Sequence, residues 1–298
     1  MAEKTVEKQL TDLLASRAVA LESDLERWLL EPDTPPQLAE AMRYCVMCGG
    51  KRMRPVLVSM TNAAVGGNLD DELVARAGVA IELVHSYSLV HDDLPAMDND
   101  VLRRGLPTAH VKFGQAMAIL TGDALLTRAF GVLSETHDLR SAALVAELAK
   151  GAGPAGMVAG QVADMGLAEV PAALAGIEYI HERKTAALIR TAARMGAICG
   201  RADDEQLEAI SEYGFNLGMA FQVVDDLLDI TGSAETTGKS CGQDARGDKL
   251  SIAAQLGVDK ARSLGKELSD RAVAAVAALG PAADELRQLA RLLAERTY

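Results

Sequence analysis

Apolar residues recur at intervals of three and four along most of the chain, which is the spacing that places them on one face of a helix. Glycine and proline interrupt this pattern where a helix is expected to end. The pattern predicts helices over residues 3–30, from about 37 to the Gly49–Gly50 pair, 54–65, 70–92, from about 107 to the mid-130s, 139–150, 156–165, 172–198, 204–230, 249–256, 258–279 and 281–297. The chain is therefore predicted to be mostly helical.

The composition supports this prediction. Of the 298 residues, 49% are hydrophobic and only 3% are aromatic. Such a mixture, in which alanine, leucine and valine dominate, favours close-packed helices over a β-rich fold. No linker or shift in composition marks a second domain, so residues 1–298 are predicted to form a single all-α domain.

The net charge of −12 argues against general nucleic-acid binding, although local clusters of lysine and arginine still allow an anionic ligand. The N-terminal residues are polar and contain no signal-peptide hydrophobic region. The longest charge-free run, residues 55–69, has 15 residues, fewer than the ~20 that a membrane span needs. We therefore expect a cytoplasmic protein without stable membrane insertion. The four cysteines lack the spacing of a zinc site and are expected to be reduced thiols packed as small apolar residues.

Two clusters of aspartates end long apolar helical patterns. The first comprises Asp92, Asp93, Asp98 and Asp100, and the second comprises Asp225, Asp226 and Asp229. Carboxylates are unfavourable in apolar surroundings unless they are paired or bind a cation. Because oxygen ligands suit Mg²⁺ better than Zn²⁺, the sequence predicts a helical protein that holds Mg²⁺, and through it a phosphate, between the two clusters.

The first cluster requires a break in its helix. On an unbroken helix Asp92 and Asp98 would point about 120° apart. Pro95 is predicted to interrupt the helix, so that both carboxylates reach one cavity. His85 and Ser88 lie within about 40° of Asp92 on the same ideal helix. A lone histidine on an apolar face is more often a satisfied core residue than a ligand, and both readings of His85 stay open.

The second cluster requires no break. Gln222, Asp225, Asp226 and Asp229 share an arc of about 100° on an ideal helix. An exposed acidic helix end is the alternative interpretation. That alternative is weakened because acids at a helix C-terminus oppose the helix dipole and therefore require a compensating cation.

Other polar stretches each allow two interpretations. The sequence Gly-Lys-Arg-Met-Arg-Pro at residues 50–55 is either an anion cradle or a solvated basic turn. Arg103 and Arg104 either grip a phosphate or neutralise the nearby aspartates in surface salt bridges. Gln161 and Asp164 form either a buried hydrogen-bonded pair, which is slightly favoured, or a wall of the site. The polar loop that runs to Gly247 is interpreted as a flexible lid.

In their order and spacing, these motifs resemble those of the trans-isoprenyl diphosphate synthases, and among them the bacterial farnesyl diphosphate synthases. The resemblance extends from about Gly49 to Ser251. It rests on Gly50-Lys51-Arg52-Met53-Arg54-Pro55, the first aspartate cluster with Arg103-Arg104-Gly105, Gly160-Gln161, Lys184-Thr185, Phe221-Gln222 followed by the second aspartate cluster, and Gly238-Lys239.

The resemblance implies an all-α bundle of roughly antiparallel helices around a deep central cavity, usually as a homodimer. It also implies Mg²⁺-dependent condensation of isopentenyl diphosphate with dimethylallyl or geranyl diphosphate to farnesyl diphosphate, through ionisation, condensation and elimination. The alternatives are a geranylgeranyl or geranyl diphosphate synthase and, with less support, a class I terpene cyclase or a non-catalytic prenyltransferase subunit.

The resemblance further implies a role for each matching residue. Catalytic residues would be Asp92, Asp93, Asp98, Lys184, Asp225 and Lys239. Asp92, Asp98 and Asp225, with Asp226 and Asp229 in support, would bind about three Mg²⁺ ions. The allylic diphosphate would be bound by Arg103, Lys184, Thr185, Gln222 and Lys239. Isopentenyl diphosphate would be bound by Gly50, Lys51, Arg54, His85 and Arg104. Product length would be set near Tyr87 and Ser88, although an ideal helix puts Tyr87 about 140° from Asp92.

Overall fold

The structure of the protein is a computed structural model that describes residues 8–9, 12–15, 17–18, 21–231 and 251–295. Its α-helices within these ranges include α2 (Leu21–Trp28), α3 (Pro36–Met47), α4 (Met53–Ala64), α5 (Glu72–Asp92), α6 (Ala109–Phe113), α7 (Gln115–Ser134), α8 (Ser141–Ala152), α9 (Met157–Asp164), α10 (Leu174–Ile180), α11 (Ala187–Cys199), α12 (Asp204–Thr231), α14 (Ile252–Leu256), α15 (Val258–Ala275) and α16 (Asp284–Glu295). The predicted all-α fold class is confirmed.

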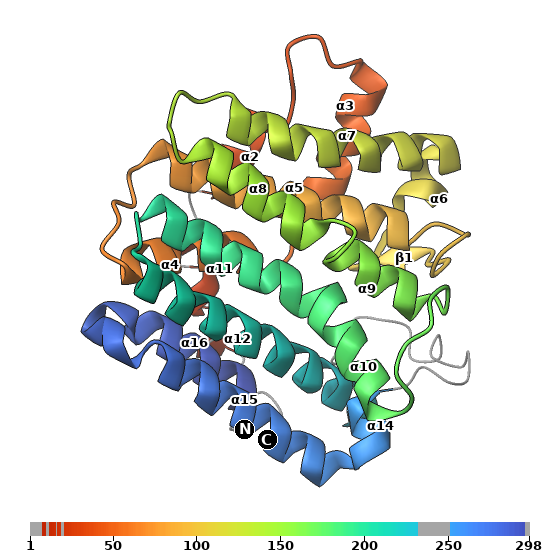
Figure 1. Ribbon diagram of the computed structural model, residues 1–298. Helices are drawn as coiled ribbons and strands as arrows, with labels where there is room; N and C mark the ends of the chain where they lie inside the picture. The colour runs from red at the N-terminus through yellow and green to blue at the C-terminus, as the bar shows by residue number, and fades with distance from the viewer. Residues whose placement is uncertain (1–7, 10–11, 16, 19–20, 232–250, 296–298) are drawn as a thin grey trace.

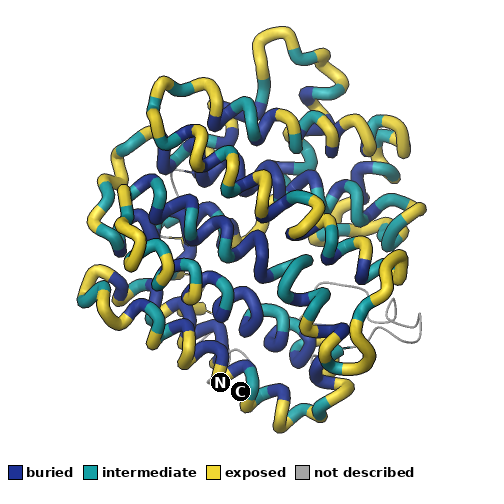
Figure 2. The backbone as a smooth tube through the Cα atoms, viewed as in Figure 1, coloured by how far each residue is buried: buried dark blue, intermediate teal, exposed yellow. Residues whose placement is uncertain are grey.

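The long helices lie side by side in successive layers (Figure 1). Helix α5 packs against α4, α7 and α11, and α12 packs against α11 and α15. Because α5 has neighbours on several sides, it is apolar around most of its circumference, and nearly all of its residues from Leu73 to Val84 are buried. The buried backbone at the centre of Figure 2 follows these inner helices. The helices α5 and α12, which carry the two aspartate clusters, therefore run through the core.

Two helices are interrupted where the apolar pattern predicted continuity. The helix predicted from about 107 to the mid-130s is divided into α6 and α7 by Gly114, whose φ of 85° is the left-handed conformation that favours glycine. The helix predicted over 172–198 contains a π-helical turn, η1 (His181–Ala186), between α10 and α11. A 3₁₀ segment, η3 (Ala277–Ala283), precedes α16. π-Helical turns inside α-helices are frequent at functional sites.

A short hairpin follows the first aspartate cluster, and the apolar periodicity gave no signal for it. Strands β1 (Leu102–Arg103) and β2 (Leu106–Pro107) pair antiparallel, with Leu102 opposite Pro107. The two residues between them, Arg104 and Gly105, have φ angles of 53° and 77°. Positive φ at both central residues is the signature of a tight hairpin turn that matches the twist of its strands. The hairpin separates the side chains of Arg103 and Arg104.

Two of the described helices, α5 and α7, have the length and hydropathy of a membrane span. In α5 the apolar window is 78% buried inside the protein, as expected for a core helix. In α7 the corresponding window is only 44% buried. Helix α7 therefore presents an apolar surface that the rest of the described chain does not cover.

Candidate active site

The first aspartate cluster lies where α5 ends and the chain folds back. The helix ends at Asp92, before Pro95, and the amide of Asp98 donates a hydrogen bond of 2.8 Å to the carbonyl of Asp92. This turn brings the two carboxylates together, as the predicted break required. Burial, and the nearby charge of Asp98, raise the pKa of Asp92 to about 6 although Lys184 opposes the shift. A carboxylate that is difficult to ionise in this way is stabilised by a bound cation.

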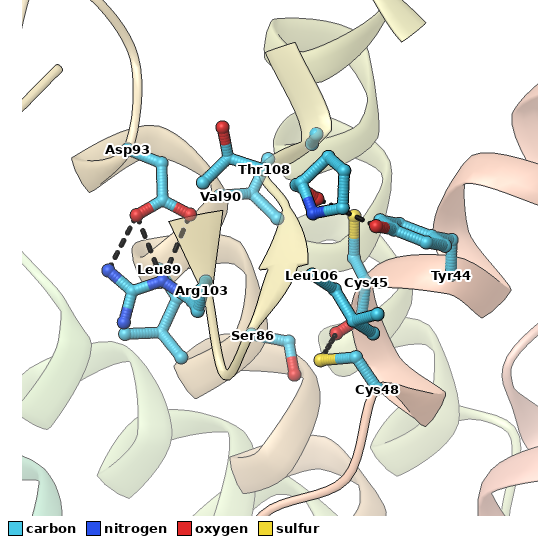
Figure 3. A pocket seen from close by; sticks show the side chains of 12 residues that line it. Tyr44, Cys45, Cys48, Ser86, Leu89, Val90, Asp93, Arg103, Leu106 and Thr108 are labelled. Carbon is cyan, nitrogen blue, oxygen red and sulfur yellow. Dashed lines mark hydrogen bonds and ion pairs between the residues drawn. The ribbon is translucent and has the colours of Figure 1, made fainter. Parts of the chain in front are cut away.

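Whereas Asp92 is half-buried, Asp93 lies in the interior. It is only 2% exposed, and the guanidinium of Arg103 donates to both of its carboxylate oxygens, at 2.9 Å from Nε and 2.5 Å from Nη2 (Figure 3). Burial raises the pKa of Asp93, whereas the hydrogen bonds from Arg103 lower it, and the net shift is upward. Of the two interpretations of Arg103, the pairing with an aspartate is present, and it also holds the guanidinium in one orientation.

Lys184 lies in the π-helical turn η1 near the first cluster. Its Nζ is 2.6 Å from Oδ2 of Asp164 on α9. Burial lowers the pKa of Lys184, but Asp164, Asp92 and Asp98 raise it by more. The net shift is upward, so the lysine remains charged. Gly160 allows this approach, because a Cβ at that position would lie 2.2 Å from the backbone nitrogen of Lys184.

The favoured interpretation of Gln161 and Asp164 as a hydrogen-bonded pair is therefore wrong. Asp164 pairs with Lys184 on the neighbouring turn. The Nε2 atom of Gln161 is buried without a hydrogen-bond partner among the described residues. The charged lysine provides a stronger partner for the carboxylate than a neutral amide does.

The second aspartate cluster lies on the unbroken helix α12, as predicted. Its acids differ in exposure: Asp225 is half-buried, Asp226 is 7% exposed and Asp229 is exposed. Gln222 on the same helix donates from Nε2 to Oδ1 of Asp226 at 3.1 Å and accepts from Thr185 at 2.8 Å. The arc predicted from the helical wheel thus contains one buried acid and two that reach the surface.

Two residues at the second cluster were not found by sequence reasoning. The amide of Ile252 donates to Oδ2 of Asp226 at 2.8 Å, and Nε2 of His181 lies 3.8 Å from the same oxygen. Burial lowers the pKa of His181 to about 4, which keeps the imidazole neutral. The position of His181, three residues before Lys184, was the available sequence signal, because residues three apart share a helical face.

A group of basic side chains lies near the first cluster, at the start of α4. Arg52 belongs to the interior, since it pairs with Glu82 at 2.8 Å and Glu22 at 3.1 Å. Arg54 is half-buried, its buried Nε has no hydrogen-bond partner among the described residues, and burial lowers its pKa to about 10. Burial and the adjacent arginines also lower the pKa of His85. Four arginines thus act electrostatically on His85, and such a concentration of positive charge suits an anion.

The remaining predicted residues of this group lie around the hairpin turn. Arg104 donates to the carbonyl of Gly49 and lies 3.6 Å from the sulfur of Cys48. Gly50 has a φ of 131°, and a Cβ there would lie 2.7 Å from the guanidinium of Arg104. Lys51 is exposed beside them. The anion-cradle interpretation of residues 50–55 therefore applies to part of that stretch, since Arg52 is engaged in buried ion pairs.

The two residues proposed to set product length, Tyr87 and Ser88, lie on α5, five and four residues before Asp92. Tyr87 is 7% exposed and meets the ring of His91 edge to face, with centroids 5.8 Å apart. Nε2 of His91 lies 3.0 Å from the carbonyl of Ile119 on α7. Ser88 donates to the carbonyl of His85 at 2.8 Å. Tyr87 thus packs with His91, which contacts α7, and its role in product length stays a prediction.

The donor set is compatible with Mg²⁺ bound together with a phosphate. Among the residues that the structure describes, no three His, Cys, Asp or Glu side chains form a group able to hold a metal ion. Mg²⁺ in proteins is commonly bound by one or two carboxylates, and substrate phosphates and water complete its octahedron. The pair Asp92 and Asp98 meets that requirement. The predicted binder Lys239 and the predicted lid lie outside the described residues.

The fold and the two carboxylate clusters agree with the trans-isoprenyl diphosphate synthase class that the sequence resembles. A model of the polyprenyl synthetase family matches residues 35–280. The chain therefore belongs to the polyprenyl synthetase family.

Named relatives within this family include synthases of two product classes. Farnesyl diphosphate synthase of Geobacillus stearothermophilus is 43% identical over 267 residues, which cover 88% of each chain. The chloroplastic geranylgeranyl pyrophosphate synthase 12 of Arabidopsis thaliana is 42% identical and is matched over 80% of this chain and 68% of its own. A geranyltransferase from Helicobacter pylori, solved in complex with magnesium and isoprenyl diphosphate, has a TM-score of 0.80 at 32% identity, covering 95% of this chain and 96% of that one. These findings confirm the predicted family and agree with the predicted prenyltransferase class.

Proposed function

We propose that the protein is a Mg²⁺-dependent prenyltransferase that condenses isopentenyl diphosphate with dimethylallyl or geranyl diphosphate to form farnesyl diphosphate. One observation carries the proposal: the carboxylates of Asp92 and Asp98 lie near a cluster of arginines around His85, the proposed basic pocket. A metal-bound diphosphate on the carboxylates and a second diphosphate in the pocket would occupy these two environments. The named relatives and the magnesium complex of the Helicobacter pylori enzyme support the same chemistry.

The allylic diphosphate would bind between the two aspartate clusters. Asp92, Asp98 and Asp225 would hold Mg²⁺, which neutralises the charge of the leaving diphosphate when it is bound. Lys184 and Arg103 would contact the same diphosphate. Asp164 and Asp93 keep these cations oriented. Lys239, which lies outside the described residues, is proposed for the same diphosphate from sequence resemblance.

Isopentenyl diphosphate would bind in the basic pocket through Gly50, Lys51, Arg54, His85 and Arg104. Neutral His85 can donate a hydrogen bond to a diphosphate oxygen while the arginines provide the charge. A class I terpene cyclase has no use for this second anion site. The pocket therefore favours a condensation between two diphosphates over cyclisation of one.

The reaction begins when the C–O bond of the allylic diphosphate breaks and the diphosphate leaves with the electron pair. The double bond of isopentenyl diphosphate attacks the resulting allylic cation and forms the new C–C bond. A proton is then lost, and an oxygen of the departing diphosphate accepts it. Oxygen dipoles of Thr185 and Gln222 would stabilise the cation while this exchange occurs.

We also propose that the chain acts as a single domain, in the cytoplasm, as a homodimer. Helix α7 carries exposed apolar side chains, among them Ile119 at 45% and Leu120 at 57%. A cavity of about 570 Å³ lies beside it, lined by residues of α3, α7, α8 and the segment between α2 and α3. An apolar face of this kind suits burial against a second copy. Neither nucleic acid nor stable membrane insertion forms part of the proposal.

The assay that tests the function supplies purified full-length protein with dimethylallyl and isopentenyl diphosphates. We expect diphosphate release and farnesyl diphosphate as the main product with Mg²⁺, and no product with excess chelator. Failure to release diphosphate, or full activity in chelator, would reject the proposal. A main product of geranylgeranyl diphosphate would keep the mechanism and assign the chain to the other product class among its relatives.

A further inference from the structure

A continuous hydrogen-bond chain connects the π-helical turn η1 to the second aspartate cluster. The hydroxyl of Thr185 donates to Oε1 of Gln222 at 2.8 Å. Nε2 of Gln222 donates to Oδ1 of Asp226 at 3.1 Å, and the amide of Ile252 donates to Oδ2 at 2.8 Å. His181 lies against the same oxygen, and Asp226 is 7% exposed. Both carboxylate oxygens of Asp226 are therefore engaged inside the protein.

The carboxylate determines the direction of every hydrogen bond in this chain. Burial raises the pKa of Asp226, the hydrogen bonds from Gln222 and Ile252 lower it, and the net shift is upward. Each of the two carboxylate oxygens faces an N–H group and therefore accepts a hydrogen bond. Of the two ends of the Gln222 amide, only Nε2 can face such an oxygen. Oε1 must then face Thr185, and the threonine hydroxyl must donate to it. The lone pairs of the threonine oxygen remain available on its other side.

We propose that Asp226 is a positioning residue that fixes this direction, so that Thr185 presents its oxygen lone pairs to the allylic cation. Asp226 is thereby assigned a role other than metal ligation, whereas its neighbour Asp225 keeps the proposed metal role. The proposal rests on the proposed prenyltransferase function. Its physical basis is that dipoles oriented before the reaction stabilise charge that develops during it.

The variant Asp226→Asn reverses the direction of the hydrogen bonds in this series, and asparagine has nearly the same size as aspartate. The amide of Ile252 can only donate, so the asparagine oxygen must face it and the asparagine NH₂ must face Gln222. The Gln222 amide then rotates, and its Nε2 donates to Thr185. The threonine hydrogen is now free to point at the cation, where it is unfavourable. We expect kcat to fall about 10- to 100-fold, somewhat less than the loss of one oxyanion-hole donor.

The effects on kcat, on KM and on the Mg²⁺ requirement distinguish a positioning role of Asp226 from metal ligation. For Asp226→Asn we expect an unchanged KM for isopentenyl diphosphate and an unchanged Mg²⁺ concentration for half-maximal rate, whereas Asp225→Asn raises that concentration. Glu208→Gln, which neutralises an exposed acid on the same helix, is the matched control for charge. An increased Mg²⁺ requirement in Asp226→Asn, or an unchanged kcat, would overturn the proposal.

A double-mutant cycle tests the direction of the hydroxyl itself. Thr185→Val alone removes the oxygen and should lower kcat. In the Asp226→Asn background the same change removes a misdirected hydroxyl, so it should cost little or restore part of the rate. The two changes are therefore expected to be strongly non-additive. Additive losses in kcat would contradict the proposed relay.

A measurement without substrate keeps the test independent of the proposed function. In protein labelled with ¹⁵N-glutamine, one side-chain amide proton of Gln222, assigned with Gln222→Ala, should be shifted downfield by the carboxylate. Asp226→Asn should remove that shift while the thermal unfolding temperature changes little. No downfield shift in the wild-type protein would overturn the positioning proposal. Absence of prenyltransfer with the shift present would instead reject the function alone.

Discussion

The aspartate pairs Asp92–Asp93 and Asp225–Asp226 have the same sequence in different helical settings. Helix α5 ends at Asp92 and the chain turns back, whereas α12 continues to Thr231. In both pairs the second aspartate is the buried one, with exposures of 2% and 7%. Because neighbours on a helix point about 100° apart, one member of each pair faces the site and the other faces the interior.

The two buried members have different partners. Asp93 holds the charged guanidinium of Arg103, and Asp226 holds the neutral amide of Gln222 and the backbone of Ile252. The first arrangement orients a cation, and the second orients a set of dipoles. Repetition of a motif therefore does not imply repetition of its role, and substitutions in the two pairs should have different kinetic effects.

The largest effects are expected at the first member of each pair. Asp92→Asn and Asp225→Asn each remove a proposed metal ligand, and we expect kcat to fall by about 10³-fold or more, because charge on the leaving diphosphate is no longer neutralised. The measurement is steady-state kinetics over a range of Mg²⁺ concentrations, with circular dichroism to verify folding. If one variant kept nearly normal turnover, the two clusters would not share the metal role.

A smaller effect is expected at the buried member of the first pair. Asp93→Asn weakens the paired hydrogen bonds to Arg103, and bonds of this charged type contribute about 1.5–3 kcal/mol. We expect a lower unfolding temperature and a KM for the allylic diphosphate raised about tenfold, as a charged contact becomes less well oriented. Asp226→Asn should instead lower kcat. The same kinetic pattern in both variants would remove the distinction between cation and dipole orientation.

The sequence predicted the helices and the clusters because apolar periodicity and helical geometry are local properties. Helix α12 is continuous from Asp204 to Thr231, so Gln222, Asp226 and Asp229 lie where the ideal helix predicted them. The break was also predicted; the helix ends at Asp92, three residues before Pro95, and the amide of Asp98 donates to the carbonyl of Asp92. These features depend on residues that are close in sequence.

Features that depend on tertiary contacts were not predictable in this way. The partner of Asp164 was misassigned because Lys184 approaches it from another helix, through the space left by Gly160. The π-helical turn and the approach of Ile252 to Asp226 have no periodic signal. Charge counting also grouped Arg52 with the anion cradle, whereas Glu82 on α5 holds it in the interior.

The smallest effect on turnover is expected from a substitution on α5 that changes product length and has no counterpart on α12. Tyr87→Ala removes a buried ring five residues before Asp92, and the space it leaves should admit a longer prenyl chain. We expect products longer than farnesyl diphosphate with the turnover reduced only slightly, as measured by chromatography of dephosphorylated products. Tyr87→Phe keeps the ring and should keep the product. Since Tyr87 packs with His91 on the side facing α7, unchanged products in Tyr87→Ala would mean that the pocket floor lies on another face of α5.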